Sequence, residues 1–86
     1  MDIQELRQQI DAIDRELVGL YCRRMETARA IGQFKRENNL PVLDSERERE
    51  LLNKVASLAG EENKQGILAL YRLLLDQSKQ RQLADG

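Results

Sequence analysis

The sequence contains no histidine, no tryptophan and only one cysteine. A single cysteine cannot form a disulfide within the chain, and the lack of histidine argues against a zinc site built from the usual ligands. Cys22 also lacks the base that activates a nucleophilic thiol, although Arg23 and Arg24 flank it. We therefore interpret Cys22 as a small residue on a packed helix and expect neither a metal nor a cofactor.

Aromatic residues and an excess of positive charge are also missing. Tyr21, Phe34 and Tyr71 are the only aromatic residues, and 14 basic side chains face 15 acidic ones. Nucleic-acid binding normally needs stacking platforms or a basic surface, so the composition argues against it. No apolar run approaches the roughly 20 residues of a membrane-spanning helix, and no signal-peptide pattern opens the chain. We expect a soluble, cytoplasmic protein without a nucleic-acid or membrane partner.

The scarcity of proline and glycine predicts a long first helix. Asp2 with Glu5 three residues later is typical of an N-cap and its reciprocal partner, and nothing stops a helix before Asn38 and Pro41. A helix over residues 2–37 would be roughly 50 Å long. A compact domain of this size has a diameter of only ~30 Å. We therefore expect a second copy of the chain to cover the rod in a two-fold dimer.

Two shorter helices are predicted to follow. Ser45 with Glu48 three residues later resembles a capping box, and Gly60 is a typical stop for the helix that begins there. The third helix is expected to begin after Asn63 and to end near Leu83. The predicted fold is all-α, with one very long helix and two shorter ones.

The first predicted helix carries an apolar stripe that is interrupted by one arginine. Three- and four-residue steps place the following residues on one face: Ile3, Leu6, Ile10, Ile13, Leu17 and Leu20. Arg24 and Thr27 come next on this stripe, and Ile31 and Phe34 continue it. A guanidinium in a helix interface is costly to desolvate unless it meets an anion. Because no acidic residue lies one turn away on that face, the partner of Arg24 must come from another segment, another chain or a ligand.

A second cation lies on the same face. Lys35 follows Arg24 by 11 residues, which leaves the two within about 20° of each other and about 16 Å apart along the axis. Ala28 and Ile31 between them leave shallow space for a small dianion. Arg7 precedes Arg24 by roughly 25 Å along the rod, so it can join this site only from the partner in an antiparallel dimer. Taken singly, Lys35 is equally compatible with a surface cation, and a residue such as Arg7 is more often on the surface.

Two polar residues occupy the inward face of the third predicted helix. Ser78 and Gln82 continue a row of larger residues there, and such groups prefer a cavity filled by water or ligand to an apolar core. The start of the second helix has a purely local explanation, because Ser45 and Glu48 can cap it and Asp44 favours its positive end. From the residues alone, this local explanation of the segment is sufficient.

Several motifs stand together at a specific spacing: LRQQIDAID at 6–14, RR at 23–24, GQFK at 32–35, PVLDSERE at 41–48, and Ser78 with Gln82. With these motifs the chain resembles the small all-helical (type II) chorismate mutases, whose members are intertwined homodimers of three-helix subunits. The resemblance covers nearly the whole chain, so residues 1–86 are expected to form a single chorismate mutase domain. It implies the conversion of chorismate to prephenate in phenylalanine and tyrosine biosynthesis.

The resemblance also implies how the substrate carboxylates are bound. Arg24 and Arg7 of the partner subunit would hold the two carboxylates of chorismate. Arg47 and Ser78 would assist them.

The same resemblance implies roles around the reacting bond. Lys35 and Gln82 would donate hydrogen bonds to the ether oxygen. Glu48 would hold the ring hydroxyl, and the backbone of Asp44 would help to position it. Two apolar residues would form the walls, namely Ile31 and Leu75. The expected catalytic residues are thus Arg24, Lys35, Glu48 and Gln82.

Two other functions compete with this one. A lyase that removes pyruvate from isochorismate would use a similar cationic pocket, but the set Asp44, Arg47 and Glu48 fits the mutase pattern better. A non-catalytic helical dimerisation module predicts an uninterrupted apolar stripe, which Arg24 and Thr27 contradict. The mutase reaction is pericyclic and needs no nucleophile, metal or redox cofactor, which suits a chain without histidine. The sequence leaves open whether the domain is free-standing or part of a bifunctional fusion.

Overall fold

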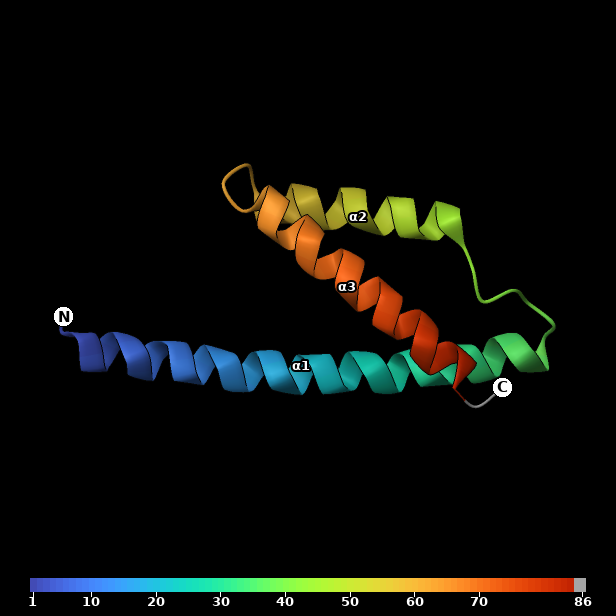
Figure 1. Ribbon diagram of the computed structural model, residues 1–86, viewed down its shortest axis with the longest axis horizontal. Helices are drawn as coiled ribbons and strands as arrows, with labels where there is room; N and C mark the ends of the chain where they lie inside the picture. The colour runs from blue at the N-terminus through green and yellow to red at the C-terminus, as the bar shows by residue number, and fades with distance from the viewer. Residues whose placement is uncertain (85–86) are drawn as a thin grey trace.

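The computed structural model describes residues 1–84 and contains three helices (Figure 1). They are α1 (Ile3–Glu37), α2 (Ser45–Ala59) and α3 (Lys64–Leu83). This confirms the prediction of an all-α fold with one very long first helix. The longest dimension is 55 Å, which is close to the length expected for the first helix alone.

The ends of α1 are set by side chains that satisfy free backbone groups. Asp2 Oδ1 accepts a hydrogen bond from the backbone amide of Glu5 at 2.9 Å, as the sequence predicts for an N-cap. At the other end, Asn38 Nδ2 donates to the carbonyl of Phe34 at 2.9 Å. Asn39 then adopts a positive φ of 54°, a conformation that asparagine tolerates better than most residues. The chain thus leaves the helix just before Pro41.

The predicted capping box of α2 is wrong by one residue. Asp44 is the N-cap, because its Oδ1 accepts from the backbone amide of Arg47 at 3.0 Å. Ser45 is the first helical residue, while the carboxylate of Glu48 pairs with Lys79 at 3.0 Å. An aspartate at the positive end of a helix both caps it and complements its dipole. The predicted stop at Gly60 is confirmed, with a φ of 82°.

Helix α3 holds the other two helices together. It packs against both α1 and α2, whereas these two, among the three described helices, do not pack against each other. In Figure 1, α3 runs diagonally from α2 to the C-terminal half of α1. The buried apolar residues are Met25 and Ala28 of α1 and Val55 of α2, and Ser78 of α3 is buried beside them. The packing leaves a wedge between α1 and α2.

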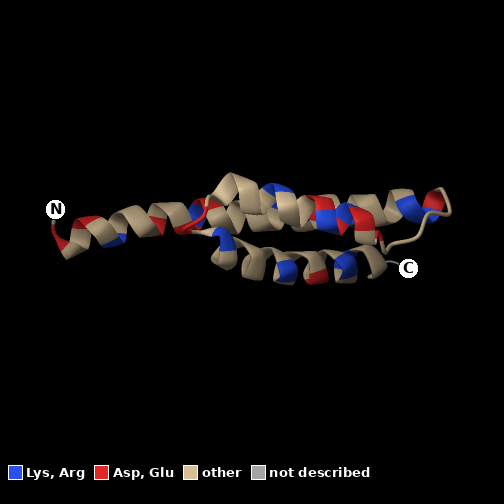
Figure 2. Ribbon diagram, turned by 90° about the horizontal axis from the view of Figure 1, so that it is seen from above, with Lys and Arg blue, Asp and Glu red and all other residues tan. Residues whose placement is uncertain are grey.

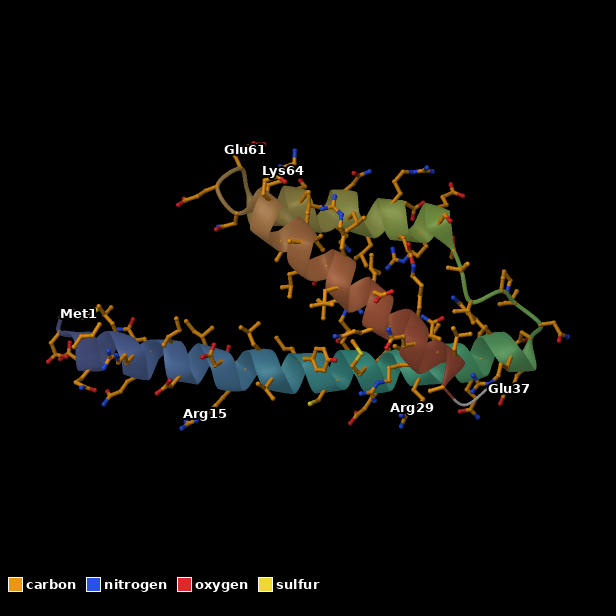
Figure 3. The ribbon with its side chains drawn as sticks, in the orientation of Figure 1. Met1, Arg15, Arg29, Glu37, Glu61 and Lys64 are labelled. Carbon is orange, nitrogen blue, oxygen red and sulfur yellow. The ribbon has the colours of Figure 1, made fainter. Side chains whose placement is uncertain are left out.

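Within residues 1–84, no other helix covers the N-terminal half of α1 (Figure 1). It projects past the other two helices (Figure 1), and side chains surround it on all sides (Figure 3). The stripe of Ile3, Leu6, Ile10, Ile13, Leu17 and Leu20 is 45–57% exposed. The apolar stripe of this half is therefore not buried by the rest of residues 1–84.

Charged residues of both signs are spread over all three helices (Figure 2). Arg15 and Arg29 project from the side of α1 that faces away from α2 and α3 (Figure 3). None of the helices within residues 1–84 is long and apolar enough to cross a membrane.

Candidate active site

A cavity of about 400 Å³ fills the wedge between α1, α2 and α3. It is lined by most of the residues proposed from the sequence: Arg24, Ile31, Lys35, Asp44, Arg47, Glu48, Leu75, Ser78 and Gln82. Ala28, which was expected to leave space between Arg24 and Lys35, also lines it, whereas sequence reasoning did not assign four further lining residues to the site: Thr27, Val42, Leu51 and Lys79. Segments far apart in the chain thus converge on one space.

Arg24 reaches the cavity from the middle of α1. Its Nη1 donates a hydrogen bond to Ser78 Oγ, and its guanidinium carbon lies 5.6 Å from the centre of the Tyr71 ring. Ser78, which is only 5% exposed, donates its own proton to the carbonyl of Leu74 at 2.7 Å. Both side-chain partners of Arg24 within residues 1–84 are neutral and come from α3. The guanidinium is therefore held in place without a carboxylate to neutralise it.

Lys35 joins three segments at the other end of the cavity. Its Nζ donates to the carbonyl of Val42 at 2.9 Å and to Gln82 Oε1 at 3.1 Å. Because the ammonium engages the oxygen of the Gln82 amide, the amide nitrogen is the end that remains to donate. Lys35 and Gln82 can therefore present N–H groups to the same part of the cavity.

The backbone of Gln82 lies directly against α1. A Cβ added to Gly32 would be 2.6 Å from both the Cα and the carbonyl oxygen of Gln82, so only glycine permits this approach. Arg36, one turn further, donates from Nη1 to the carbonyl of Gln82 at 2.8 Å. In the structure, Gly32 and Arg36 fix the height of Gln82 above α1.

Two carboxylates line the cavity, those of Asp44 and Glu48, and both lie on the side formed by α2. Asp44 caps the helix, and Arg47 is exposed one turn later. Glu48 Oε1 lies 3.0 Å from Lys79 Nζ, and the two side chains are 29% and 32% exposed. Both side chains of this pair line the cavity and are partly accessible to solvent.

Arg7 is the one predicted site residue that lies away from the cavity. It is exposed on the N-terminal half of α1 and does not line this space. Seventeen residues of helix, or roughly 25 Å, separate it from Arg24. A single chain therefore brings together every proposed site residue except Arg7.

The cavity suits a small organic dianion. Four cations and two carboxylates line it, which leaves an excess of two positive charges. The cations lie at separate points of the wall, and neutral donors stand between them. Within residues 1–84, no group of three histidine, cysteine, aspartate or glutamate side chains could hold a metal ion. The arrangement can bind, orient and polarise a ligand.

Known proteins match this chain in sequence and in structure. Residues 6–83 match the family chorismate mutase type II. A chorismate mutase of Methanocaldococcus jannaschii is 26% identical over 79 residues, which cover 90% of this chain and 80% of that protein. A conserved hypothetical protein of Pyrococcus furiosus has a similar structure, with a TM-score of 0.77, 35% identity and 93% coverage of both chains.

A longer relative matches only in part. The bifunctional chorismate mutase/prephenate dehydratase of Aquifex aeolicus is 42% identical over 57 residues, which cover 66% of this chain but 16% of that protein. Because the family match spans nearly the whole described structure, the chain belongs to the chorismate mutase type II family. The family expected from the sequence motifs is thereby confirmed.

Proposed function

We propose that this chain converts chorismate to prephenate, the step that leads toward phenylalanine and tyrosine, and that residues 1–86 act as one chorismate mutase domain. Family membership supports the reaction class. The observation that carries the proposal is the pair Lys35 and Gln82. One ammonium fixes the amide oxygen, so a cationic and a neutral donor face one point of a cavity that also holds Arg24.

The chemistry fits these groups. In the rearrangement, the bond from the ether oxygen to the ring breaks while a carbon–carbon bond forms, and no atom enters or leaves. The enzyme therefore has to hold the enolpyruvyl chain over the ring and stabilise negative charge on the ether oxygen. A donor aimed at such developing charge contributes on the order of 10²–10³ in rate. Lys35 and Gln82 are proposed to be these donors.

The remaining residues are proposed to bind the substrate. Arg24 would hold one carboxylate, with Ser78 fixing its guanidinium through their hydrogen bond, and Arg47 stands at the exposed edge to assist. Glu48 would accept a hydrogen bond from the ring hydroxyl, and the backbone at Asp44 would position it. Ile31 and Leu75 form apolar walls on opposite helices.

The proposed enzyme is a homodimer in which Arg7 completes the site of the partner subunit. Two observations support this. The apolar stripe on the N-terminal half of α1 is exposed in the single chain, and burying such a stripe is the usual driving force for association. In an antiparallel pairing of two α1 helices, the N-terminal half of one would lie beside the cavity of the other.

The test is to add the purified protein to chorismate and to follow the loss of chorismate absorbance, with prephenate identified by chromatography. We expect saturable conversion to prephenate alone. Isochorismate is the control substrate. Release of pyruvate from isochorismate without mutase activity would replace the proposal by the lyase, and no conversion of either substrate would contradict both.

A further inference from the structure

Lys79 lines the cavity but has no role in the function proposed above. It follows Ser78 on α3 and lies about 60° around that helix from Gln82. This places it on the side of the row facing α2, where its Nζ meets Glu48 Oε1 at 3.0 Å. The ion pair therefore joins α3 to α2 in the wall of the cavity.

We propose that Lys79 is a positioning residue for Glu48, which it holds toward the ring of a bound dianion. The inference rests on the proposed function, because it assigns Glu48 to the ring hydroxyl. A glutamate side chain has several staggered rotamers, so a second contact is needed to fix the direction of its carboxylate. The contact of one oxygen, Oε1, with Lys79 leaves the second oxygen to accept a hydrogen bond from the hydroxyl.

The ion pair of Lys79 and Glu48 also changes the electrostatic interaction of the site with a dianion. A carboxylate in the wall of a site for a dianion repels the ligand that it has to bind. Lys79 compensates that charge at a distance of 3.0 Å, so Glu48 can act as an acceptor without reducing the attraction from Arg24 and Lys35. Removing Lys79 reduces the excess of lining positive charge by one and leaves Glu48 uncompensated.

A purely stabilising role for the pair accounts poorly for its position. The side chains of Lys79 and Glu48 are 32% and 29% exposed, and ion pairs this accessible to solvent add little to the stability of the fold. Its location in the wall of the cavity gives it an effect on ligand binding instead.

The experiment is a double-mutant cycle in the full chain, with steady-state kinetics on chorismate. Lys79→Met should raise KM on the order of tenfold while kcat falls by less than about threefold, because the Glu48 contact is made in both the bound and the transition state. In a Glu48→Gln background, the same change should alter KM by less than about twofold. Lys79→Arg, which keeps the cation, should stay within about twofold of wild type.

Lys54→Met is the matched control, because it removes the same charge from an exposed position on α2 that does not line this cavity. Its KM should equal that of wild type. The thermal unfolding midpoint of Lys79→Met should stay within about 3 °C of wild type, which separates positioning from a loss of fold.

The outcomes are distinct. If Lys79→Met behaves like Lys54→Met in an active enzyme, the inference fails and the proposed function stands. An equal rise in KM with and without the Glu48 carboxylate would mean that Lys79 binds the substrate itself, which also overturns the positioning role. A wild-type protein that leaves chorismate unchanged overturns the proposed function and this inference together.

Discussion

The two halves of α1 share one continuous helix and one apolar stripe, but they meet different surroundings. In the C-terminal half, Met25 and Ala28, which lie beside the stripe, are buried at 3% and 4% exposure beneath α3, while the stripe residues Ile31 and Phe34 are 42% and 59% exposed. In the N-terminal half, Leu17 and Leu20 are 53% and 54% exposed, and no other helix covers them (Figure 1). The C-terminal half of the helix thus has a buried face beneath α3, whereas the apolar stripe of the N-terminal half has no neighbour within residues 1–84 (Figure 1).

This difference shows that an amphipathic pattern specifies which face is to be buried but not which chain buries it. In the C-terminal half, the polar residue Arg24 interrupts the stripe. Helix α3 of the same chain supplies Ser78 and Tyr71 as its partners. The N-terminal half stays apolar, and no other helix within residues 1–84 covers it (Figure 1). Four predictions can break or sharpen this contrast.

The largest expected effect tests whether the two halves serve different active sites. Arg7→Ala and Arg24→Ala homodimers should each lose on the order of a thousandfold in kcat/KM, because each removes a carboxylate partner from every site. Unfolding and refolding an equal mixture should restore about a quarter of the wild-type activity, since half of the dimers are mixed and one of their two sites is intact. Chorismate consumption measures the recovery.

A matched mixture supplies the control. Arg24 and Gln82 line the cavity of the same chain, so mixed dimers of Arg24→Ala with Gln82→Glu should recover no activity. Recovery in this control, or its absence in well-formed Arg7/Arg24 mixtures, would contradict the assignment of the two halves to different sites.

The second prediction concerns the self-contained half and its donor Gln82. A carboxylate at this position donates a hydrogen bond only when protonated, and when ionised it repels charge on the ether oxygen. Gln82→Glu should lose on the order of a few hundredfold in kcat near neutral pH and regain activity on acidification. The wild type should be nearly flat between about pH 6 and 8, because it has no histidine. Equal pH profiles for variant and wild type would remove Gln82 from the reacting bond.

The third prediction concerns the uncovered half. Leu17→Asp places a charge on the apolar stripe and should weaken dimer formation on the order of a hundredfold, measured by sedimentation. Val18, which is 63% exposed, lies about 100° away around the helix. Val18→Asp introduces the same charge and should leave the association unchanged. If both variants associate like wild type, the stripe is not the dimer interface.

The smallest expected effect compares two glycines, one in each half. Gly32→Ala forces a methyl group within 2.6 Å of the Gln82 backbone and should lower the free energy of unfolding by about 2 kcal/mol. Gly19 has open space around its added Cβ, and Gly19→Ala should raise stability by about 0.5–1 kcal/mol through helix propensity. Denaturant unfolding measures both. Equal effects of the two changes would mean that α3 is not held closely against α1.

Much of this fold could be predicted because the chain marks its helix ends with few and strong signals. Asp2, Gly60 and Asn63 each stand at a helix boundary. The error at α2 came from two adjacent cap formers, Asp44 and Ser45, between which local pattern could not decide. In the structure Asp44 is the N-cap, because its charge favours the positive end of the helix and because Glu48 pairs with Lys79 of α3.

The site was predictable to the extent that its residues break a local pattern. Arg24 interrupts an apolar stripe, and Gln82 ends an inward row with a polar group, so both stood out. Lys79 did not, because its partner Glu48 is 31 residues away and meets it only through the packing of α2 on α3. The carbonyl of Val42 carried no signal, since every residue has one. The role of Arg7 stays a prediction, because it depends on a second chain.

The uninterrupted course of α1 has a consequence for how chains of this kind can vary in length. Arg24, Gly32 and Lys35 lie at fixed positions along one helix. One residue inserted between Arg24 and Gly32 would rotate every later residue of the helix by about 100° and shift it along the axis by about 1.5 Å. Gly32 would then leave the contact with Gln82, and Lys35 would point out of the cavity. An insertion at 61–62, in the turn between α2 and α3, would lengthen a loop that does not line the cavity. The part of the site that lies on α1 therefore tolerates substitutions in this helix but not inserted or deleted residues.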